Sequence, residues 1–281
     1  MRSAHQQKPL TRCSYIFDGP NAVRKGCSVS ELFETAGEVS LFGFRALAGL
    51  FSRPFEGQQL RRALADIGAK SLPLIVASGF ALGAVLTLHT RSTLVTFGAT
   101  AWIPSVQALA FFLEIGPLVT ALLVAGRVGS GIGAVLSNMR ATEQIDAIES
   151  LSIDSFKYLV VPRIIACTLA LPILTLFLDF SGLLGGFLAE YSASRMSFYM
   201  YLTRSFSSFE WSNFYAPTLK TAVFGFVIGT ISSFLGYTTN EGAQGVGKAA
   251  TRSVVVSSLL IILLDVVLIK FIFFMFPESA L

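Results

Sequence analysis

The stretch from Glu114 to Arg163 reads EIGPLVTALLVAGRVGSGIGAVLSNMRATEQIDAIESLSIDSFKYLVVPR. Its first half belongs to an apolar segment from about Phe111 to Leu136, and a second apolar segment begins at Tyr158. Apolar runs of about 20 residues are long enough to cross a bilayer. The acidic stretch between them, from Thr142 to Asp154, is therefore predicted to be a tight loop that joins two membrane spans.

The acidic loop has the pattern of a short amphipathic helix. Its apolar residues recur every third position, at Ile145, Ile148 and Leu151. A parallel acidic stripe is formed by Glu143, Asp146 and Glu149. Thr142 is the expected N-cap, and acids in a first turn suit the helix dipole. We predict a surface helix that contacts something outside the membrane; the alternative is that its apolar stripe packs on the protein's own spans.

Composition agrees with a membrane protein. Of the 281 residues 53% are hydrophobic and 14% are charged, and the mean hydropathy is +0.67. These values exclude an ordinary soluble domain. No basic patch with interleaved aromatic residues is present, so the net charge of +4 does not indicate nucleic-acid binding.

The apolar segments predict an all-α integral membrane protein with five spans. We place the spans at about Leu72–Leu88, Val106–Leu136, Tyr158–Leu188, Ala216–Leu235 and Ser253–Phe276. His89 to Arg91 are expected to end the first span at the far surface. The segment Glu190–Asn213 is expected to be external with one short helix, and the glycine-rich stretch 236–249 to be a cytoplasmic loop.

Charge distribution predicts the orientation. Ten of the 21 Lys and Arg residues precede Ser71, which favours a cytoplasmic N-terminus and, with five spans, an external C-terminus. The expected organisation is a mobile cytoplasmic segment 1–28, interfacial and connecting helices 29–70, a five-span domain 71–276 and an external tail 277–281.

The segment 29–52 is predicted to be a helix that lies in the membrane interface. Its acidic residues, Glu31, Glu34 and Glu38, fall beside one apolar face, which is typical of an interfacial helix. Its length of about 25 apolar-rich residues would also allow it to cross the membrane, which is the alternative.

Glycine pairs at four-residue spacing occur in four spans, where they let helix backbones approach closely. They are Gly79 and Gly83, Gly129 and Gly133, Gly182 and Gly186, and Gly225 and Gly229. The simplest interpretation is packing within one chain.

Charged residues at membrane depth are the remaining candidates. Glu114 and Arg127 lie in the second span, Asp179 in the third and Asp265 near the middle of the fifth. Such residues are costly in lipid and are expected to face a partner or a wet cavity. Asp265 is interpreted either as a buried interhelical contact or as part of a pathway, and Glu114 as a residue that borders a cavity.

No catalytic machinery is evident. Gly242 to Lys248 match the spacing of a phosphate-binding loop, but Ala249 stands where Ser or Thr would hold magnesium, and the motif lies between two spans. The two histidines, His5 and His89, cannot form a metal cluster. We therefore expect no metal and no nucleotide on this chain.

The motifs also resemble a known family. EIGP at 114–117, ALLVAGRVGS at 121–130, MRATEQIDAIESL at 139–151 and VVPR at 160–163 are similar to the MlaE (YrbE) permeases, as is GVGKAATR at 245–252. These are membrane subunits of ABC transporters that serve MCE lipid-transfer systems. Two positions depart from the family pattern: Leu113 replaces an Arg and Val135 replaces a Glu, so no role of those side chains carries over.

The resemblance implies a function and partners. It implies a permease of the bacterial inner membrane that moves phospholipid or a related lipid between that membrane and an external MCE-protein conduit. It also implies a homodimer around the lipid cavity and a separate ATPase dimer that binds ATP and magnesium. A small STAS-domain subunit occurs in some such systems. The acidic helix, with Glu143, Gln144, Ile145, Asp146, Ile148 and Glu149, is then the expected ATPase-docking element. The alternative from other classes is a passive membrane scaffold or a membrane-integral lipid-modifying enzyme.

Overall fold

The computed structural model describes residues 29–50, 57–207, 212–239 and 242–275. Within those ranges the chain is helical and contains no strand. Five segments are long and apolar enough to cross a membrane: Gly57–Thr96, Thr100–Ala141, Phe156–Ser194, Phe214–Tyr237 and Gly242–Ile272. The prediction of an all-α, five-span membrane protein is confirmed. The segments 1–28 and 277–281 lie outside the described residues.

Most of the spans are built from several consecutive helical pieces. The first span joins α2 (Gly57–Leu64), η2 (Ala65–Ala69) and α3 (Lys70–Thr96). The second joins η3 (Thr100–Trp102), α4 (Ile103–Ala110), η4 (Phe111–Ile115), α5 (Gly116–Val124), η5 (Ala125–Gly129) and α6 (Ser130–Ala141). The third joins η6 (Phe156–Val160) and α8 (Val161–Ser194), and the last two are α10 (Ser212–Tyr237) and α11 (Gly242–Met275). The short helices are α7 (Gln144–Ser150) and α9 (Phe198–Ser205), and α1 (Val29–Leu50) precedes the spans.

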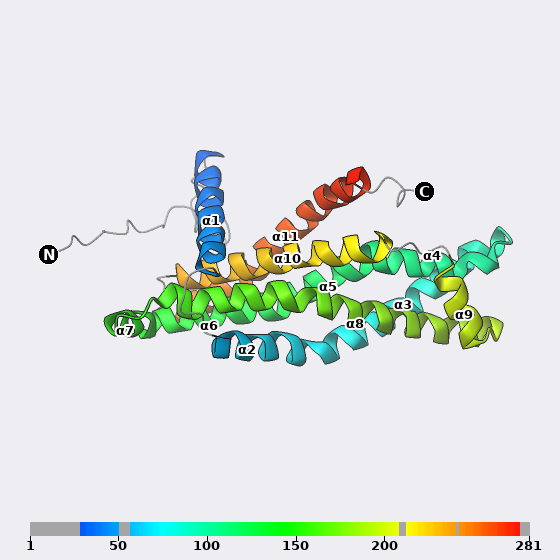
Figure 1. Ribbon diagram of the computed structural model, residues 1–281, viewed down its shortest axis with the longest axis horizontal. Helices are drawn as coiled ribbons and strands as arrows, with labels where there is room; N and C mark the ends of the chain where they lie inside the picture. The colour runs from blue at the N-terminus through cyan, green and yellow to red at the C-terminus, as the bar shows by residue number, and fades with distance from the viewer. Residues whose placement is uncertain (1–28, 51–56, 208–211, 240–241, 276–281) are drawn as a thin grey trace.

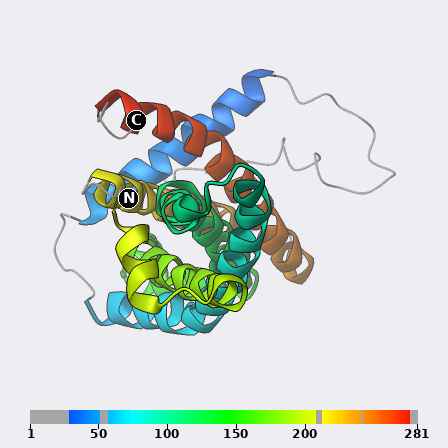
Figure 2. The ribbon, with the colours of Figure 1, turned by 90° about the vertical axis from the view of Figure 1, so that its right-hand side faces the viewer.

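The long helices run side by side along the longest axis of the molecule, with α7 at one end and α9 at the other (Figure 1). Helix α1 lies across this axis, where it packs on α10 and α8, and the end-on view shows it lying outside the bundle (Figure 2). A helix across the axis of the spans has the orientation expected of an interfacial helix, whose place at the membrane surface stays a prediction. The C-terminal half of α11 leans away from the bundle (Figure 1).

Two boundaries predicted from the sequence are wrong. The helix of the first span does not end at His89–Arg91 but continues to Thr96, and Arg91 pairs with Glu190 of α8 at 2.5 Å. The glycine-rich stretch is not a loop from 236 to 249, since α10 continues to Tyr237 and α11 begins at Gly242. The small residues there serve helix packing: Ala249 is buried, and its carbonyl lies close to Gly133 of α6.

Four turns of the spans have π-helical geometry. Two of them directly precede helices with proline in the first turn, namely η4 before Pro117 and η6 before Pro162. Proline has no amide hydrogen and leaves a carbonyl one turn earlier without its usual partner. A wider turn accommodates this gap while the span continues.

The glycine pairs lie at close contacts within the chain. A Cβ on Gly79 would meet Ser181 and the backbone of Leu178, and a Cβ on Gly83 would meet the carbonyl of Gly182. The other contacts pair Gly182 with Phe111, Gly186 with Gln107, Gly129 with Ser232, Gly133 with Ser253, Gly225 with Cys167 and Gly229 with Ile164. Helices α3 and α8 form the most extensive pair, and glycine allows their backbones to touch.

Replacing Gly83 with alanine should destabilise the bundle, because the new methyl group meets the Gly182 carbonyl and α3 must move away from α8. Overpacking of this kind costs about 1–3 kcal/mol, so the melting temperature of the purified protein should fall by several degrees. Gly131→Ala is the matched control, because no atom lies within 4 Å of its Cβ position. Equal melting temperatures for the two variants would contradict the close contact.

Candidate functional site

Three charged side chains from three spans meet inside the bundle. The Lys220 ammonium on α10 lies 2.9 Å from a carboxylate oxygen of Glu114 on η4, to which it donates a hydrogen bond. The same nitrogen lies 3.0 Å from Oδ1 of Asp265 on α11, as an ion pair without hydrogen-bond geometry. We call Glu114, Lys220 and Asp265 the charged triad.

Burial differs sharply among the three members. Lys220 is 3% exposed and Asp265 4%, whereas the side chain of Glu114 is 36% exposed. A buried charge is tolerated only when it is paired, and removing one partner leaves an uncompensated charge. The two carboxylates outnumber the single ammonium, so the triad carries an excess of negative charge when all three are ionised. Glu114 is the member that a ligand or water can reach.

The sequence analysis named Glu114 and Asp265 but missed Lys220. Lys220 is the only charged residue between Ala216 and Leu235. A lone base in an apolar span has to find an acid on another span, and this requirement was the signal that could have found it. The structure thus brings two of the predicted residues together through a third that was not predicted.

Arg127 lies elsewhere. Its guanidinium donates a hydrogen bond to the Ser71 hydroxyl on α3, and the side chain is half-buried. Asp179 of α8 is almost fully buried against Gly116, and its Oδ1 has no hydrogen-bond partner within the described residues. Neither residue contacts the charged triad through any bond in the described part of the chain.

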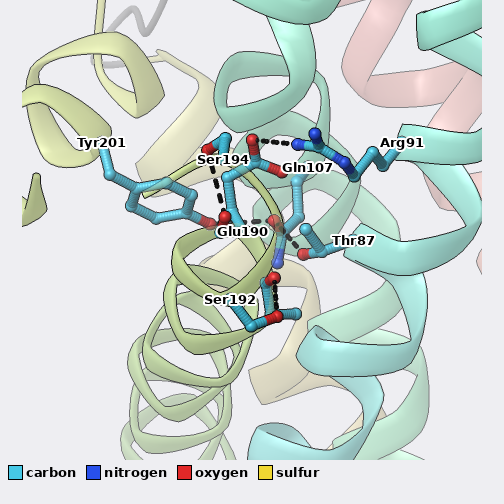
Figure 3. A network of polar contacts seen from close by, with 8 residues as sticks. Thr87, Arg91, Gln107, Glu190, Ser192, Ser194 and Tyr201 are labelled. Carbon is cyan, nitrogen blue, oxygen red and sulfur yellow. Dashed lines mark hydrogen bonds and ion pairs between the residues drawn. The ribbon is translucent and has the colours of Figure 1, made fainter. Parts of the chain in front are cut away.

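A second polar network lies at the α9 end and ties four helices together (Figure 3). Gln107 of α4 accepts hydrogen bonds from Thr87 of α3 and from the Tyr201 hydroxyl of α9, the latter at 2.8 Å. Glu190 of α8 pairs with Arg91 of α3 at 2.5 Å. Tyr201 is fully buried. These bonds fix α9, the short helix in the described part of the segment Glu190–Asn213, on the bundle.

The predicted surface helix is present as α7, with two differences. Thr142 is not the N-cap, because it ends α6; the N-cap is Glu143, whose backbone is left-handed with φ of 56° and whose side chain makes no capping bond. The apolar stripe is also divided. Ile145 is fully buried in the core and Ile148 packs against the same core, whereas Leu151 is 72% exposed. The alternative, packing on the protein's own spans, is therefore correct for the first two residues.

The acids of this loop also have partners within the chain. Asp146 pairs with Arg140 at 2.7 Å, and Glu149 accepts a hydrogen bond from Ser155 at 2.5 Å. Asp154 accepts hydrogen bonds from two backbone amides at the start of η6. Besides these acids, the exposed residues of the loop include Glu143, Gln144, Ala147, Leu151 and Ile153. We call these five residues the loop surface.

The described residues offer no site for phosphate chemistry of the kind the spacing of Gly242 to Lys248 suggested. This segment is the first two turns of α11, so the amides beyond its opening turn are engaged within the helix and cannot surround a phosphate. In the described part of the chain no three His, Cys, Asp or Glu side chains lie close enough to hold a metal ion.

Comparison with known proteins identifies the family. Residues 60–271 match the family model described as Permease MlaE. A protein of Rickettsia felis named "Probable ABC transporter permease protein" is 40% identical over 82% of this chain and 89% of its own length. The chloroplastic protein TRIGALACTOSYLDIACYLGLYCEROL 1 of Arabidopsis thaliana is 35% identical over 77% of this chain and 61% of its own length. The "Intermembrane phospholipid transport system permease protein MlaE" of Haemophilus influenzae is 30% identical over 88% of this chain and 95% of its own length.

The match to the family model reaches all five spans and includes the charged triad, whose members lie between residues 60 and 271. ABC permeases are non-catalytic membrane subunits that work with a separate ATPase. This multi-pass chain belongs to the MlaE permease family.

Proposed function

We propose that this chain is the permease subunit of an ABC transporter that moves phospholipid or a related lipid between the inner membrane and an MCE-protein conduit. The Haemophilus relative, whose name includes phospholipid transport, aligns with 88% of the chain. The observation that carries the proposal is the charged triad. Charged groups are retained at membrane depth where they serve a pathway, and Glu114 keeps one edge of this group accessible.

The lipid cavity is proposed to lie between two copies of the chain. Two hollows on the described surface have volumes of about 360 and 310 Å³, and neither is lined by the triad. Such volumes suit small drug-sized ligands, and a phospholipid with two acyl chains is larger. Helix α11 also exposes a row of large apolar residues, namely Leu259, Leu263, Val266, Val267 and Phe271. This face supports a homodimer in which α11 contacts the second protomer.

The separate ATPase is proposed to bind at the α7 end and to hold the ATP and magnesium. On the loop surface, the apolar side chains of Leu151 and Ile153 are exposed, and so is the side chain of Glu143. When a short helix docks in a groove of another protein, apolar side chains anchor it and the charges beside them set its orientation. The MCE protein would then lie at the α9 end, and a STAS-domain subunit would join on the ATPase side.

The orientation follows from the same arrangement. With the ATPase in the cytoplasm, the α7 end is cytoplasmic, the α9 end is external, and the N-terminus is cytoplasmic as its ten basic residues favour. Gln244, at the start of α11, and Ser207, after α9, then lie on opposite sides of the inner membrane.

Neutralising the charged triad should stop lipid transfer while leaving the protein assembled. Lys220→Met alone leaves the carboxylates of Glu114 and Asp265 without their cationic partner. It should both destabilise the fold and abolish lipid transfer. The triple variant with Glu114→Gln, Lys220→Met and Asp265→Asn removes the charges together and should fold. We expect its ATP-dependent transfer of fluorescent phospholipid from proteoliposomes to fall at least about tenfold, or about 1.4 kcal/mol of lost stabilisation.

The matched control for this test is Lys70→Met, which removes a lysine from an exposed pair with Asp66. Surface pairs of this kind contribute about 0–1 kcal/mol, so transfer should be unchanged. A folded triple variant that transfers lipid at the wild-type rate would show that the triad is structural only. If lipid transfer by the wild-type complex did not depend on ATP, a passive scaffold would be favoured.

Replacing Leu151 with aspartate should release the ATPase. Leu151 is exposed and has no place in the core, so the variant should fold, while an apolar anchor lost from an interface costs about 2 kcal/mol or more. The amount of ATPase that co-purifies should fall at least tenfold. Gln58→Asp on the exposed face of α2 adds the same charge and should leave co-purification unchanged. Full retention of the ATPase by the Leu151 variant would place the docking site elsewhere.

Cysteine labelling should confirm the orientation. In a chain whose Cys13, Cys27 and Cys167 have been replaced by alanine, Ser207→Cys should react with an impermeant maleimide in intact spheroplasts. Gln244→Cys should react only after lysis. If both positions reacted from the same side, the chain would not cross the membrane once between them, and the proposed orientation would be wrong.

A further inference from the structure

The loop that follows α7 is bonded directly to the end of α10. Ser155 donates a hydrogen bond to the Glu149 carboxylate at 2.5 Å, and the Ser155 and Tyr237 hydroxyls lie 2.8 Å apart. Tyr237 also donates to the same oxygen of Glu149 at 3.2 Å. Glu149 belongs to α7, Ser155 immediately precedes η6, and Tyr237 is the last residue of α10. We call these three residues the hydroxyl bridge.

Aromatic rings hold the Tyr237 side chain in place. Phe42 of α1 packs edge-on against Phe156 at 4.9 Å between ring centroids and against Phe234 at 5.4 Å, and the Tyr237 ring lies 6.4 Å from both Phe42 and Phe156. The Arg45 guanidinium lies 4.6 Å from the Phe156 ring centroid. Such ring contacts stabilise by about 0.5–1.5 kcal/mol each. The Tyr237 ring therefore has its own packing, apart from the bonds of its hydroxyl group.

The bridge lies between the proposed docking site and the charged triad. Glu149 is two residues from Leu151 on the loop surface, and Tyr237 shares α10 with Lys220. The 17 residues from Lys220 to Tyr237 span about 25 Å of continuous helix at 1.5 Å per residue. An uninterrupted helix moves as one body, so a displacement of Tyr237 is also a displacement of Lys220.

Within the described residues, the other attachments of helix α7 involve the core and the neighbouring helix α6. Helix α7 is seven residues long, begins without a side-chain cap, and is fixed by the burial of Ile145, the packing of Ile148 on the core and the pair between Asp146 and Arg140. The latter pair links α7 to α6, which is adjacent in sequence. The hydroxyl bridge is a hydrogen-bonded link between α7 and α10, whose two members Glu149 and Tyr237 are 88 residues apart in the sequence.

We propose that the hydroxyl bridge transmits movement of the ATPase-docking loop to α10, and that Tyr237 is a positioning residue for transport. This inference rests on the proposed function. When the ATPase pulls on the loop surface, the bond from Tyr237 to Glu149 makes α10 follow, and the pairing of Lys220 with Glu114 and Asp265 changes as a result. Without the bond the loop moves alone and ATP hydrolysis is no longer matched to lipid movement.

The test is Tyr237→Phe in the reconstituted complex, with lipid transfer and ATP hydrolysis measured on the same proteoliposomes. The variant keeps the ring packing and removes only the hydroxyl group, so the complex should assemble and hydrolyse ATP. The number of lipids transferred per ATP should fall about tenfold, within the range of measured couplings between sites. Glu149→Gln retains an oxygen acceptor and should keep most of the coupling, whereas Glu149→Leu should lose it.

Tyr158→Phe is the matched control. The Tyr158 hydroxyl accepts a hydrogen bond from Gln59 at 2.6 Å, which links η6 to α2 and does not involve α7 or α10. It should leave the ratio of lipid to ATP unchanged. A wild-type ratio for Tyr237→Phe, or an equal loss for Tyr158→Phe, would overturn the inference.

Two further results separate this inference from the proposed function. If the wild-type complex transfers no lipid, the proposed function itself fails. If the wild-type complex transfers lipid and Tyr237→Phe does so equally well, only the bridge fails. The double variant Tyr237→Phe with Glu149→Leu should be no worse than either single variant, since both remove the same bond; additive losses would contradict a shared link.

Discussion

The pairing of Lys220 with two carboxylates is the constraint on which the arrangement of the spans depends. An ammonium group in an apolar helix cannot be left alone at membrane depth, and its partners come from the second and fifth spans. The pairing therefore fixes how α10 is rotated and where it stands along η4 and α11. Glycine contacts bring helices close together, but they permit sliding and rotation that a charge pair at about 3 Å does not.

In the proposed function, the loop between the second and third spans contacts both the bundle and the ATPase with one short helix. Its sequence divides the apolar residues between them: Ile145 and Ile148 pack on the core, while Leu151 and Ile153 point outward. The acids are divided in a similar way, with Asp154 capping the start of η6 and Glu143 exposed. This division lets a helix of seven residues be attached firmly to the bundle while it keeps apolar and acidic side chains exposed, as the proposed docking of the ATPase requires.

The sequence alone was sufficient for the number of spans and for the surface helix, because apolar length and three-residue periodicity depend on local sequence. It was insufficient where contacts between distant segments decide. His89 to Arg91 looked like a helix end until Glu190, 99 residues later, supplied the partner of Arg91. The glycines at 242–247 looked like a loop, because the contact of the following Ala249 with Gly133 of α6 joins segments that are distant in the sequence. Lys220 was overlooked for the same reason, although a single base in an apolar segment demanded an acidic partner.

The π-helical turns of the second span have a consequence for how this family can vary. Each such turn contains one residue more than an α-helical turn, and that residue rotates everything after it by about 100° around the helix axis. With η4 and η5 in place, one span directs Glu114 to α10 and Arg127 to Ser71 on α3. Deletion of one residue within 111–115 would leave an apolar helix of adequate length, yet it would turn one of these side chains toward the wrong neighbour. A one-residue deletion in this span of a related protein therefore changes which helix face the following side chains lie on, and matters little for the length of the span.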